Sequence, residues 1–345
     1  MAQLARRWSA LERAWGVRHQ TRFALDGDGD VQLAAQPAAN GCATSEGGAQ
    51  GGPEQFNKGR QMSTATADAA PRPSLGKRLL ANTFVRILIA VLASIGTMAL
   101  LLMLSEIAPK PMRVVWPTLL AAAGCMAGYR FYVRKVEKRE PLEAAGPRIL
   151  PELGMGFGIG AALAVGVAGS LLLCGALQVQ GLGDWRAIFK PLPEQIMVAT
   201  FEELVFRAIL FRIVEGRWGF RIAATSNVLL FALAHLPNEN VSALAILATA
   251  SAGAGLLGVY LLTRRVWIAM GMHFAWNYLF DALISVPVSG HAARGWIQVT
   301  PAGPEWLSGG AYGVEGSVLT LIAWTAAAIV LFRVARQRPA NVLPR

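Results

Sequence analysis

Apolar residues occur along this chain in long runs that short polar stretches separate. From Ile87 onward the runs approach the length that an α-helix needs to cross a bilayer, about 20 residues. They predict eight transmembrane helices, at residues 87–105, 114–133, 155–178, 194–212, 221–236, 241–262, 266–286 and 317–332. The fifth run is short, so we expect a tilted helix or one that stops inside the protein. The sequence therefore predicts an all-α fold, a polytopic transmembrane helix bundle.

The first part of the chain lacks this pattern. Residues 26–60 are rich in Gly, Ala, Asn, Gln and Asp and show no sustained apolar period, which predicts a disordered N-terminal tail over residues 1–76. An alternative expectation is that translation starts at Met62, in which case residues 1–61 are a mis-assigned start. The remainder divides into a membrane-embedded domain, residues 77–336, and a short basic tail, residues 337–345.

Composition agrees with this class of protein. Hydrophobic residues make up 54% of the chain and charged residues 15%, with a mean hydropathy of +0.42, which excludes an ordinary soluble protein. The net charge is +11, but the cations lie mostly at the ends of apolar runs, so they indicate topology and not a nucleic-acid partner. The three cysteines are isolated and predict neither a disulfide framework nor a CxxC metal site.

Positive charge is concentrated on one side of the predicted bundle. With eight crossings, the polar segments on that side carry Lys77, Arg78, Arg86, Arg134, Lys135, Lys138, Arg139, Arg148, Arg212, Arg217, Arg221, Arg264, Arg265, Arg333, Arg336, Arg338 and Arg345. The other side carries fewer cations, among them Lys110, Arg113, Arg186 and Lys190. Because positive charge marks the cytoplasmic side, we expect both termini to be cytoplasmic. The Ala-, Gly- and Arg-rich composition favours a bacterial cell membrane.

The fourth run contains three charged residues, Glu202, Glu203 and Arg207. A charge inside a bilayer costs at least a few kcal/mol, so ionisable residues there indicate a functional site. Glu203 and Arg207 are four positions apart with the acid first, the favourable order for an ion pair on one helix face. Glu202 is then left without a cation.

Two further runs carry polar residues that can accompany Glu202. The fifth ends in His235, and the seventh contains His273 and Asn277, which project together from one helix face. Two kinds of chemistry use this set. In one, Glu202, His235 and His273 bind a divalent metal such as zinc, which activates water. In the other, Glu202 is a general base, His235 positions the water, and His273 and Asn277 stabilise an oxyanion.

Structural roles are the alternative for each of these residues. Glu203 and Arg207 can join helices, and a histidine near a helix end is often only packed. The chain could then be a non-catalytic membrane module, such as a peptide-immunity protein or a scaffold, that uses these polar groups for helix cohesion. A transporter is disfavoured because the two halves share no repeated hydropathy pattern. The absence of a nucleophile-elbow serine and of HExxH disfavours serine hydrolases and zincins.

Taken together, the motifs resemble those of the CPBP family of intramembrane proteases, which includes type II CAAX prenyl endopeptidases and bacterial bacteriocin-processing and immunity proteins. The resemblance covers about residues 135–285, and its motifs are Glu202-Glu203-x-x-x-Arg207, Phe231-x-x-x-His235 and His273-x-x-x-Asn277, in the family's order. It implies an intramembrane endopeptidase in which Glu202 and His235 activate water, while His273 and Asn277 stabilise the oxyanion.

The resemblance also implies supporting roles and partners. Glu203 and Arg207 would organise the site, and the substrate would be a membrane-associated protein or peptide within the lipid bilayer. The family's eukaryotic members cut prenylated C-terminal CaaX tripeptides, a substrate that a bacterium would lack. The family has been called a metalloprotease family, although its eukaryotic branch resembles a glutamate-only protease. Both the metal and the metal-free mechanism remain open at this point.

Overall fold

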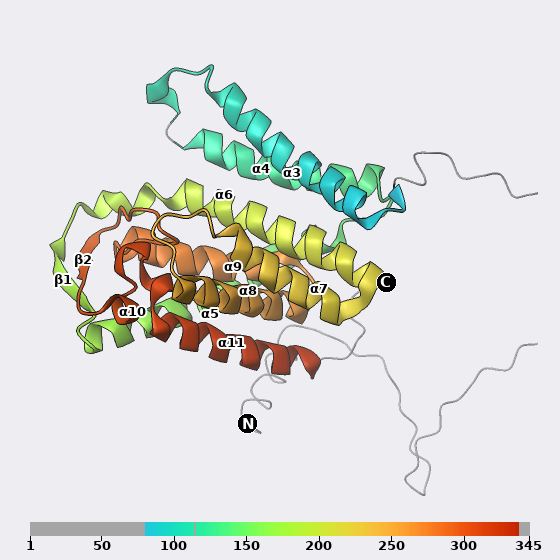
Figure 1. Cartoon of the computed structure of the whole chain (residues 1–345). Coiled ribbons are helices and arrows are strands. Elements are labelled where there is room, and N and C mark those ends of the chain that lie inside the picture. The colour runs from blue at the N-terminus through green and yellow to red at the C-terminus, as the bar shows by residue number, and fades with distance from the viewer. Residues whose placement is uncertain (1–79, 114, 338–345) are drawn as a thin grey trace, which may run out of the picture. The chain divides into compact units, whose positions relative to one another are not determined.

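The structure is a computed structural model that describes residues 80–113 and 115–337; the predicted N-terminal tail and nearly all of the C-terminal tail lie outside this part. The long helices are α3 (Thr83–Ser105), α4 (Trp116–Lys135), α5 (Ile149–Leu173), α6 (Leu192–Glu203), α7 (Arg212–Ala234), α8 (Ala243–Thr263), α9 (Val266–Tyr278) and α11 (Val318–Arg336). Two π-helices, Leu204–Phe211 and Leu279–Leu283, extend α6 and α9. The predicted all-α fold is confirmed (Figure 1).

Short elements connect the long helices. They are the helix α10 (Glu305–Ser308), the 3-10 turns Lys110–Met112, Leu142–Ala144, Trp185–Phe189, Gly310–Tyr312 and Val314–Gly316, and the strands β1 (Leu177–Leu182) and β2 (Ile297–Pro301). The strands pair antiparallel, with a bulge between Val179 and Gly181. This two-stranded sheet joins the loop after α5 to the loop before α11, and both loops lie at the same end of the bundle (Figure 1).

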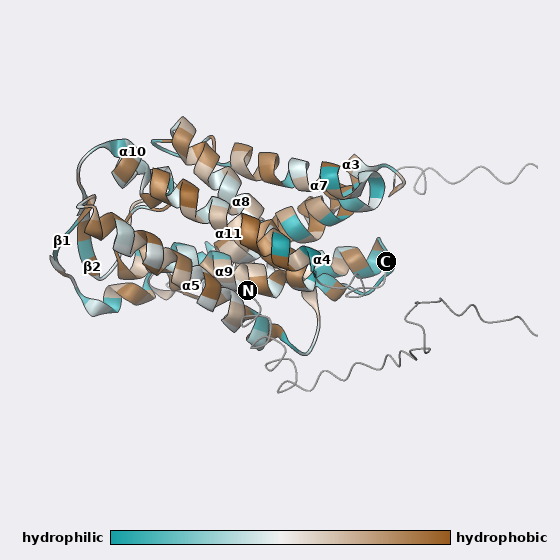
Figure 2. Ribbon diagram, turned by 90° about the horizontal axis from the view of Figure 1, so that it is seen from below, coloured by the Kyte–Doolittle hydropathy of each residue, from teal (hydrophilic) through white to brown (hydrophobic). Residues whose placement is uncertain are grey.

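Four helices of the described part are long and apolar enough to cross a membrane: α3, α5, α8 and α11. The other predicted spans are helical as well, and their crossing stays a prediction. Three of them, 194–212, 221–236 and 266–286, carry the charged and polar residues of the motifs. The third span begins earlier than its apolar run, at Ile149, and ends at Leu173, because Gly175 turns the chain with a φ of 69°. Figure 2 shows hydrophobic colour along the helices and hydrophilic colour mainly near their ends.

The predicted fourth and fifth spans form one helical stretch with a break. The helical hydrogen-bond pattern runs from α6 through the π-helix into α7, but Gly219 has φ 80° and ψ 172°, which no helix accommodates. Glycine adopts this conformation without steric penalty. The turn therefore falls at Gly219, and the chain returns along the second half of α7 to end at His235.

Helix α9, which carries His273 and Asn277, packs very closely against α5. A Cβ at Gly160 would lie 2.3 Å from the carbonyl oxygen of Met272, and one at Gly156 would lie 2.0 Å from that of Ile268. Gly271 makes the reciprocal contact, 2.2 Å from the carbonyl oxygen of Leu153. Small residues at such crossings let helix backbones approach in a membrane. These close contacts fix the position of α9 along α5 and its rotation about its own axis.

A cluster of charges joins the helices at the arginine-rich end. The Glu137 carboxylate accepts hydrogen bonds from Arg86 of α3 (2.7 Å), from Arg139 (2.8 Å) and from Arg212 of α7 (3.0 Å). Burial alone would raise the pKa of Glu137, but the three guanidinium groups outweigh it and lower the pKa to about 2. Beyond this anchor, the α3–α4 hairpin diverges from the other helices toward its tip (Figure 1).

Candidate active site

Three of the predicted residues form a buried hydrogen-bonded triad. The Oε1 atom of Glu203 accepts from Nη1 of Arg207 at 3.0 Å and from Nδ1 of His273 at 2.9 Å. Glu203 and Arg207 are fully buried, and His273 is 6% exposed. The predicted ion pair along one helix face is therefore present, and it also connects α6 with α9. Since a carboxylate can only accept, Nδ1 of His273 carries the proton of this bond.

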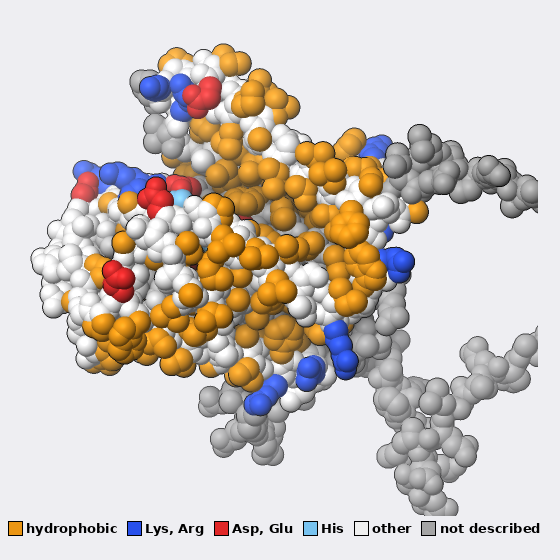
Figure 3. Space-filling model, in the orientation of Figure 1, with side chains coloured by type: hydrophobic (Ala, Val, Ile, Leu, Met, Phe, Trp, Pro, Cys, Tyr) orange, Lys and Arg blue, Asp and Glu red, His pale blue; other side chains and the backbone are white. Residues whose placement is uncertain are grey.

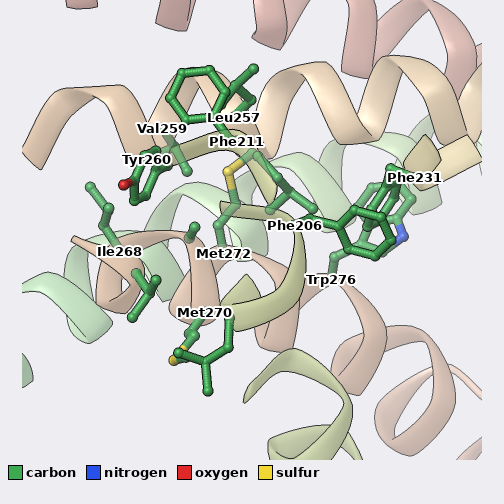
Figure 4. Packing of buried hydrophobic residues seen from close by; sticks show 14 of the residues in the cluster. Phe206, Phe211, Phe231, Leu257, Val259, Tyr260, Ile268, Met270, Met272 and Trp276 are labelled. Atoms are coloured by element: carbon green, nitrogen blue, oxygen red, sulfur yellow. The ribbon is translucent and has the colours of Figure 1, made fainter. Parts of the chain in front are cut away.

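The guanidinium of Arg207 lies among aromatic rings and a backbone carbonyl. Its Cζ atom lies 4.8 Å from the ring centre of Phe231, and Nη2 donates to the carbonyl oxygen of Gly253 at 3.2 Å. Phe206 stacks edge-on against Phe231 with ring centres 5.0 Å apart. Figure 4 shows Phe206, Phe231 and Trp276 together at one side of the apolar cluster. Cation–π contact and ion pairing together offset the free-energy cost of burying this charge.

The π-helix that follows Glu203 is fixed by a polar residue from α7. Asn227 is fully buried and donates through Nδ2 to the carbonyl oxygen of Phe206 at 2.6 Å. A π-helix widens the turn and disturbs the regular pairing of carbonyl groups, and it is frequent at functional sites. Asn227 is a polar residue within an otherwise apolar span, and the structure assigns it this structural contact.

Glu202, in contrast to Glu203, makes no hydrogen bond to another described residue. Its side chain is 13% exposed, and Oε2 lies 3.9 Å from Nε2 of His273, beyond hydrogen-bonding distance. The adjacent acid Glu203 already neutralises Arg207. The expectation that Glu202 is the unpaired carboxylate of the segment thus agrees with the geometry.

His235 occupies the C-cap position of α7, at the end of the helix. Its Nδ1 atom lies 2.8 Å from the carbonyl oxygen of Phe231, and the two rings are 4.9 Å apart. Because a carbonyl accepts, Nδ1 is the protonated nitrogen in this bond. In the neutral ring, Nε2 is then free to accept a proton or a hydrogen bond. Phe231 therefore sets both the tautomer and the orientation of His235.

All four predicted catalytic residues line one cavity of about 440 Å³. They are Glu202, His235, His273 and Asn277. Asn277 is 7% exposed, and its amide makes no hydrogen bond to another described residue, so it is free for a bound molecule. The cavity walls between these groups are mostly apolar, including Val198, Phe201, Val205, Ala252 and Leu256.

The rim of the cavity contains charged residues that the motifs did not predict. Arg294, from the loop after α9, pairs with Glu194 at 2.7 Å and with Asp281 at 2.8 Å, and Gln195 donates to Asp281 at 3.0 Å. His291 also lines the rim. Asp281 lies one turn beyond Asn277, so helical spacing could have predicted that it belongs to the site. The loop residues gave no sequence signal because tertiary folding alone brings them to the cavity.

Glu315 is a second carboxylate in the cavity lining. It accepts from Nε1 of Trp276 at 3.0 Å and from Oγ of Ser289 at 2.5 Å. Since Trp276 precedes Asn277 on α9, this contact connects the loop before α11 with the helix that carries the amide. Unlike Glu202, Glu315 has a partner on each oxygen.

The metal hypothesis named Glu202, His235 and His273 as ligands. Within residues 80–113 and 115–337, no group of three or more His, Cys, Asp or Glu side chains is arranged to hold a metal ion. The metal-dependent version of the chemistry therefore stays a prediction. A carboxylate without a hydrogen bond, two imidazoles and an amide around one cavity can perform general-base hydrolysis with groups of the chain itself.

Comparison with known proteins agrees with the motifs. Residues 185–279 match the family model described as type II CAAX prenyl endopeptidase Rce1-like. No curated protein and no solved structure matches the chain. The matched segment includes α6, α7, α8 and α9, and so contains every residue predicted for catalysis. Residues 185–279 are thus similar to the Rce1-like family of type II CAAX prenyl endopeptidases, which confirms the family resemblance.

Proposed function

We propose that this protein is an intramembrane endopeptidase that hydrolyses a peptide bond of a membrane-associated protein or peptide. The observation that carries the proposal is the contrast between two adjacent carboxylates. Glu203 is fully buried and its Oε1 accepts from Arg207 and His273, although its Oε2 has no partner, whereas Glu202 lines the cavity and makes no hydrogen bond to a described residue. A purely structural site gives no role to the second acid.

In the proposed reaction, Glu202 takes a proton from a water molecule while the water oxygen attacks the carbonyl carbon of the scissile bond. The free Nε2 of His235 accepts a hydrogen bond from the same water. Glu202 then returns the proton to the leaving amine, and the carbon–nitrogen bond breaks. This cycle consumes one water molecule and regenerates the carboxylate.

The oxyanion of the tetrahedral intermediate would accept a hydrogen bond from the amide of Asn277. His273 donates its Nδ1 proton to Glu203, so it can donate to the oxyanion only through a protonated Nε2. Glu203 and Arg207 are positioning residues in this scheme, because they act through His273.

We further propose a multi-pass protein of the bacterial cell membrane with both termini in the cytoplasm. Support comes from the apolar helices α3, α5, α8 and α11 and from the arginine-rich end formed by the α4–α5 loop, the turn at Gly219 and the α8–α9 turn.

The test is cleavage of candidate peptides by the purified full-length chain in detergent. Glu202→Gln and His235→Ala should lower kcat at least a hundredfold, the range that loss of a general base produces. Glu140→Gln is the matched control, since Glu140 is an exposed carboxylate in the α4–α5 loop, outside the cavity. Retained cleavage by Glu202→Gln overturns the proposal, and activity that survives a strong chelator overturns its metal-dependent version.

A non-catalytic membrane module is the second candidate. The observation that favours it is the buried triad, which connects α6 with α9 and, through Gly253, with α8. This candidate predicts that Glu202→Gln keeps the biological activity. Comparing the membrane peptidome of cells with wild-type and Glu202→Gln alleles separates the two candidates and identifies the substrate when peptides differ.

A further inference from the structure

The two ends of the helix bundle differ in charge. One end, formed by the α4–α5 loop, the turn at Gly219, the α8–α9 turn and the terminus of α11, carries Arg86, Arg134, Lys135, Lys138, Arg139, Arg148, Arg212, Arg217, Arg221, Arg264, Arg265, Arg333 and Arg336. The other end carries five described cations, Lys110, Arg113, Arg186, Lys190 and Arg294, together with the acids Glu106, Asp184, Glu194, Glu239, Asp281, Glu305 and Glu315. In Figure 3, Lys and Arg occur without acids at the right, whereas acids and further cations lie together at the left.

The catalytic cavity belongs to the cation-poor end. Helices α6, α8 and α11 begin at that end. Thr249 and Thr320 line the cavity from the first halves of α8 and α11, and Glu202 from the first half of the helical stretch that runs from Leu192 to the break at Gly219. Helices α7 and α9 finish there, and their lining residues come from their last parts, for example His235 and Asn277. None of the cations of the arginine-rich end lines the cavity.

The mouth of the cavity is formed by segments of the same end. Asn238 from the α7–α8 turn, Glu194 from the first turn of α6, and His291 and Arg294 from the loop before β2 form its rim. Arg294 is the one Lys or Arg that lines the cavity among the described residues, and its charge is balanced by Glu194 and Asp281. A polypeptide that enters the cavity therefore contacts these rim residues first.

We propose that the site opens on the extracytoplasmic face of the membrane, and that its substrate is a membrane-anchored polypeptide presented from that face. The physical reason is the positive-inside rule: lysine and arginine at helix ends stay on the cytoplasmic side, which places the arginine-rich end inside and the cavity outside. That the polypeptide is a substrate rests on the proposed function, whereas the side of the membrane to which the cavity opens does not depend on catalysis.

The geometry also sets a requirement on the substrate. Glu202 lies ten residues beyond the start of α6, so its Cα is about 15 Å below the outer end of that helix at 1.5 Å per residue. An extended chain advances about 3.3 Å per residue. The scissile bond therefore needs roughly five unfolded residues between it and the folded or polar part that remains outside the membrane. Short translocated tails and signal-like segments meet this requirement, whereas a folded surface loop does not.

The experiment is cysteine labelling of the full-length chain in intact bacterial cells with a membrane-impermeant maleimide. Cys42→Ser and Cys174→Ser remove two natural thiols, and the third, Cys125, is fully buried. In this background, His291→Cys reports on the cavity rim, and Glu140→Cys on the arginine-rich end; both positions are exposed.

We expect His291→Cys to be labelled to the same extent before and after the cells are permeabilised, and Glu140→Cys to be labelled only afterwards. The reverse pattern, labelling of both variants in intact cells, or no labelling of His291→Cys under either condition overturns the inference. The labelling needs no activity. A failure of Glu202-dependent cleavage in detergent overturns the proposed function alone, and a reversed labelling pattern overturns the sidedness alone.

Discussion

Two adjacent carboxylates should respond to the same chemical change in opposite ways. Glu203→Gln removes the charge that neutralises the fully buried Arg207, while Glu202→Gln removes a charge that has no cation as a hydrogen-bond partner. Breaking one side of a buried ion pair costs about 3–5 kcal/mol, because the other charge is left uncompensated. We therefore expect Glu203→Gln to lower the Tm by roughly 6 °C or more. Glu202→Gln should leave the Tm nearly unchanged and abolish cleavage.

The assay is thermal unfolding of the purified variants in detergent, measured beside peptide cleavage on the same preparations. The double variant Glu203→Gln with Arg207→Met supplies an internal check, because it removes the uncompensated charge and should recover part of the lost stability. Equal Tm losses for Glu202→Gln and Glu203→Gln would refute the assignment of a structural role to Glu203 and a catalytic role to Glu202. So would a double variant that is less stable than the sum of its two single changes predicts.

Three further predictions concern stability. Gly160→Ala should destabilise the protein by about 1–3 kcal/mol, because its Cβ would meet a backbone carbonyl of α9 at 2.3 Å, whereas Gly158→Ala on the same helix meets nothing within 4 Å and serves as the control in thermal unfolding. Asn227→Leu should cost about 1–3 kcal/mol in the same assay, because it leaves the buried carbonyl of Phe206 without its donor, and an unchanged Tm would contradict that role. The pKa of Glu137 is lowered to about 2, so its contribution to the free energy of unfolding is present above the ordinary value of 4.5 and is lost as the pH falls from there toward 2. Glu137→Gln should therefore reduce the loss of stability on acidification, measured by unfolding between pH 3 and pH 7. An unchanged pH dependence in this variant would contradict the prediction.

Local pattern predicted the helices and one ion pair of the candidate site. Apolar runs of spanning length predict helices because the backbone in a bilayer must satisfy its own hydrogen bonds. The spacing of Glu203 and Arg207 predicts their ion pair because residues four apart share a helix face, and the structure has that bond at 3.0 Å. His273 and Asn277 likewise line the same cavity. These features depend on residues within one turn of each other.

Other features could not be predicted because they join segments that are far apart in the chain. The sequence offered Glu203 a cation on its own helix, but nothing indicated that His273, seventy residues later, would donate to the same oxygen. Arg294 and Glu315 reach the cavity from loops with no periodic pattern. The close crossing of α5 and α9 depends on glycines whose neighbours are backbone atoms of another helix.

The sequence by itself thus determined an all-helical membrane bundle, an unpaired acid in its fourth apolar run, and the residue types that surround that acid, because hydropathy and helical spacing are local properties. Only the tertiary structure decided which carboxylate is neutralised by the histidine, which groups form the rim, and toward which end of the bundle the cavity opens. Those outcomes depend on how helices from distant parts of the chain pack, and a pairing across α6 and α9 has no counterpart in any local pattern.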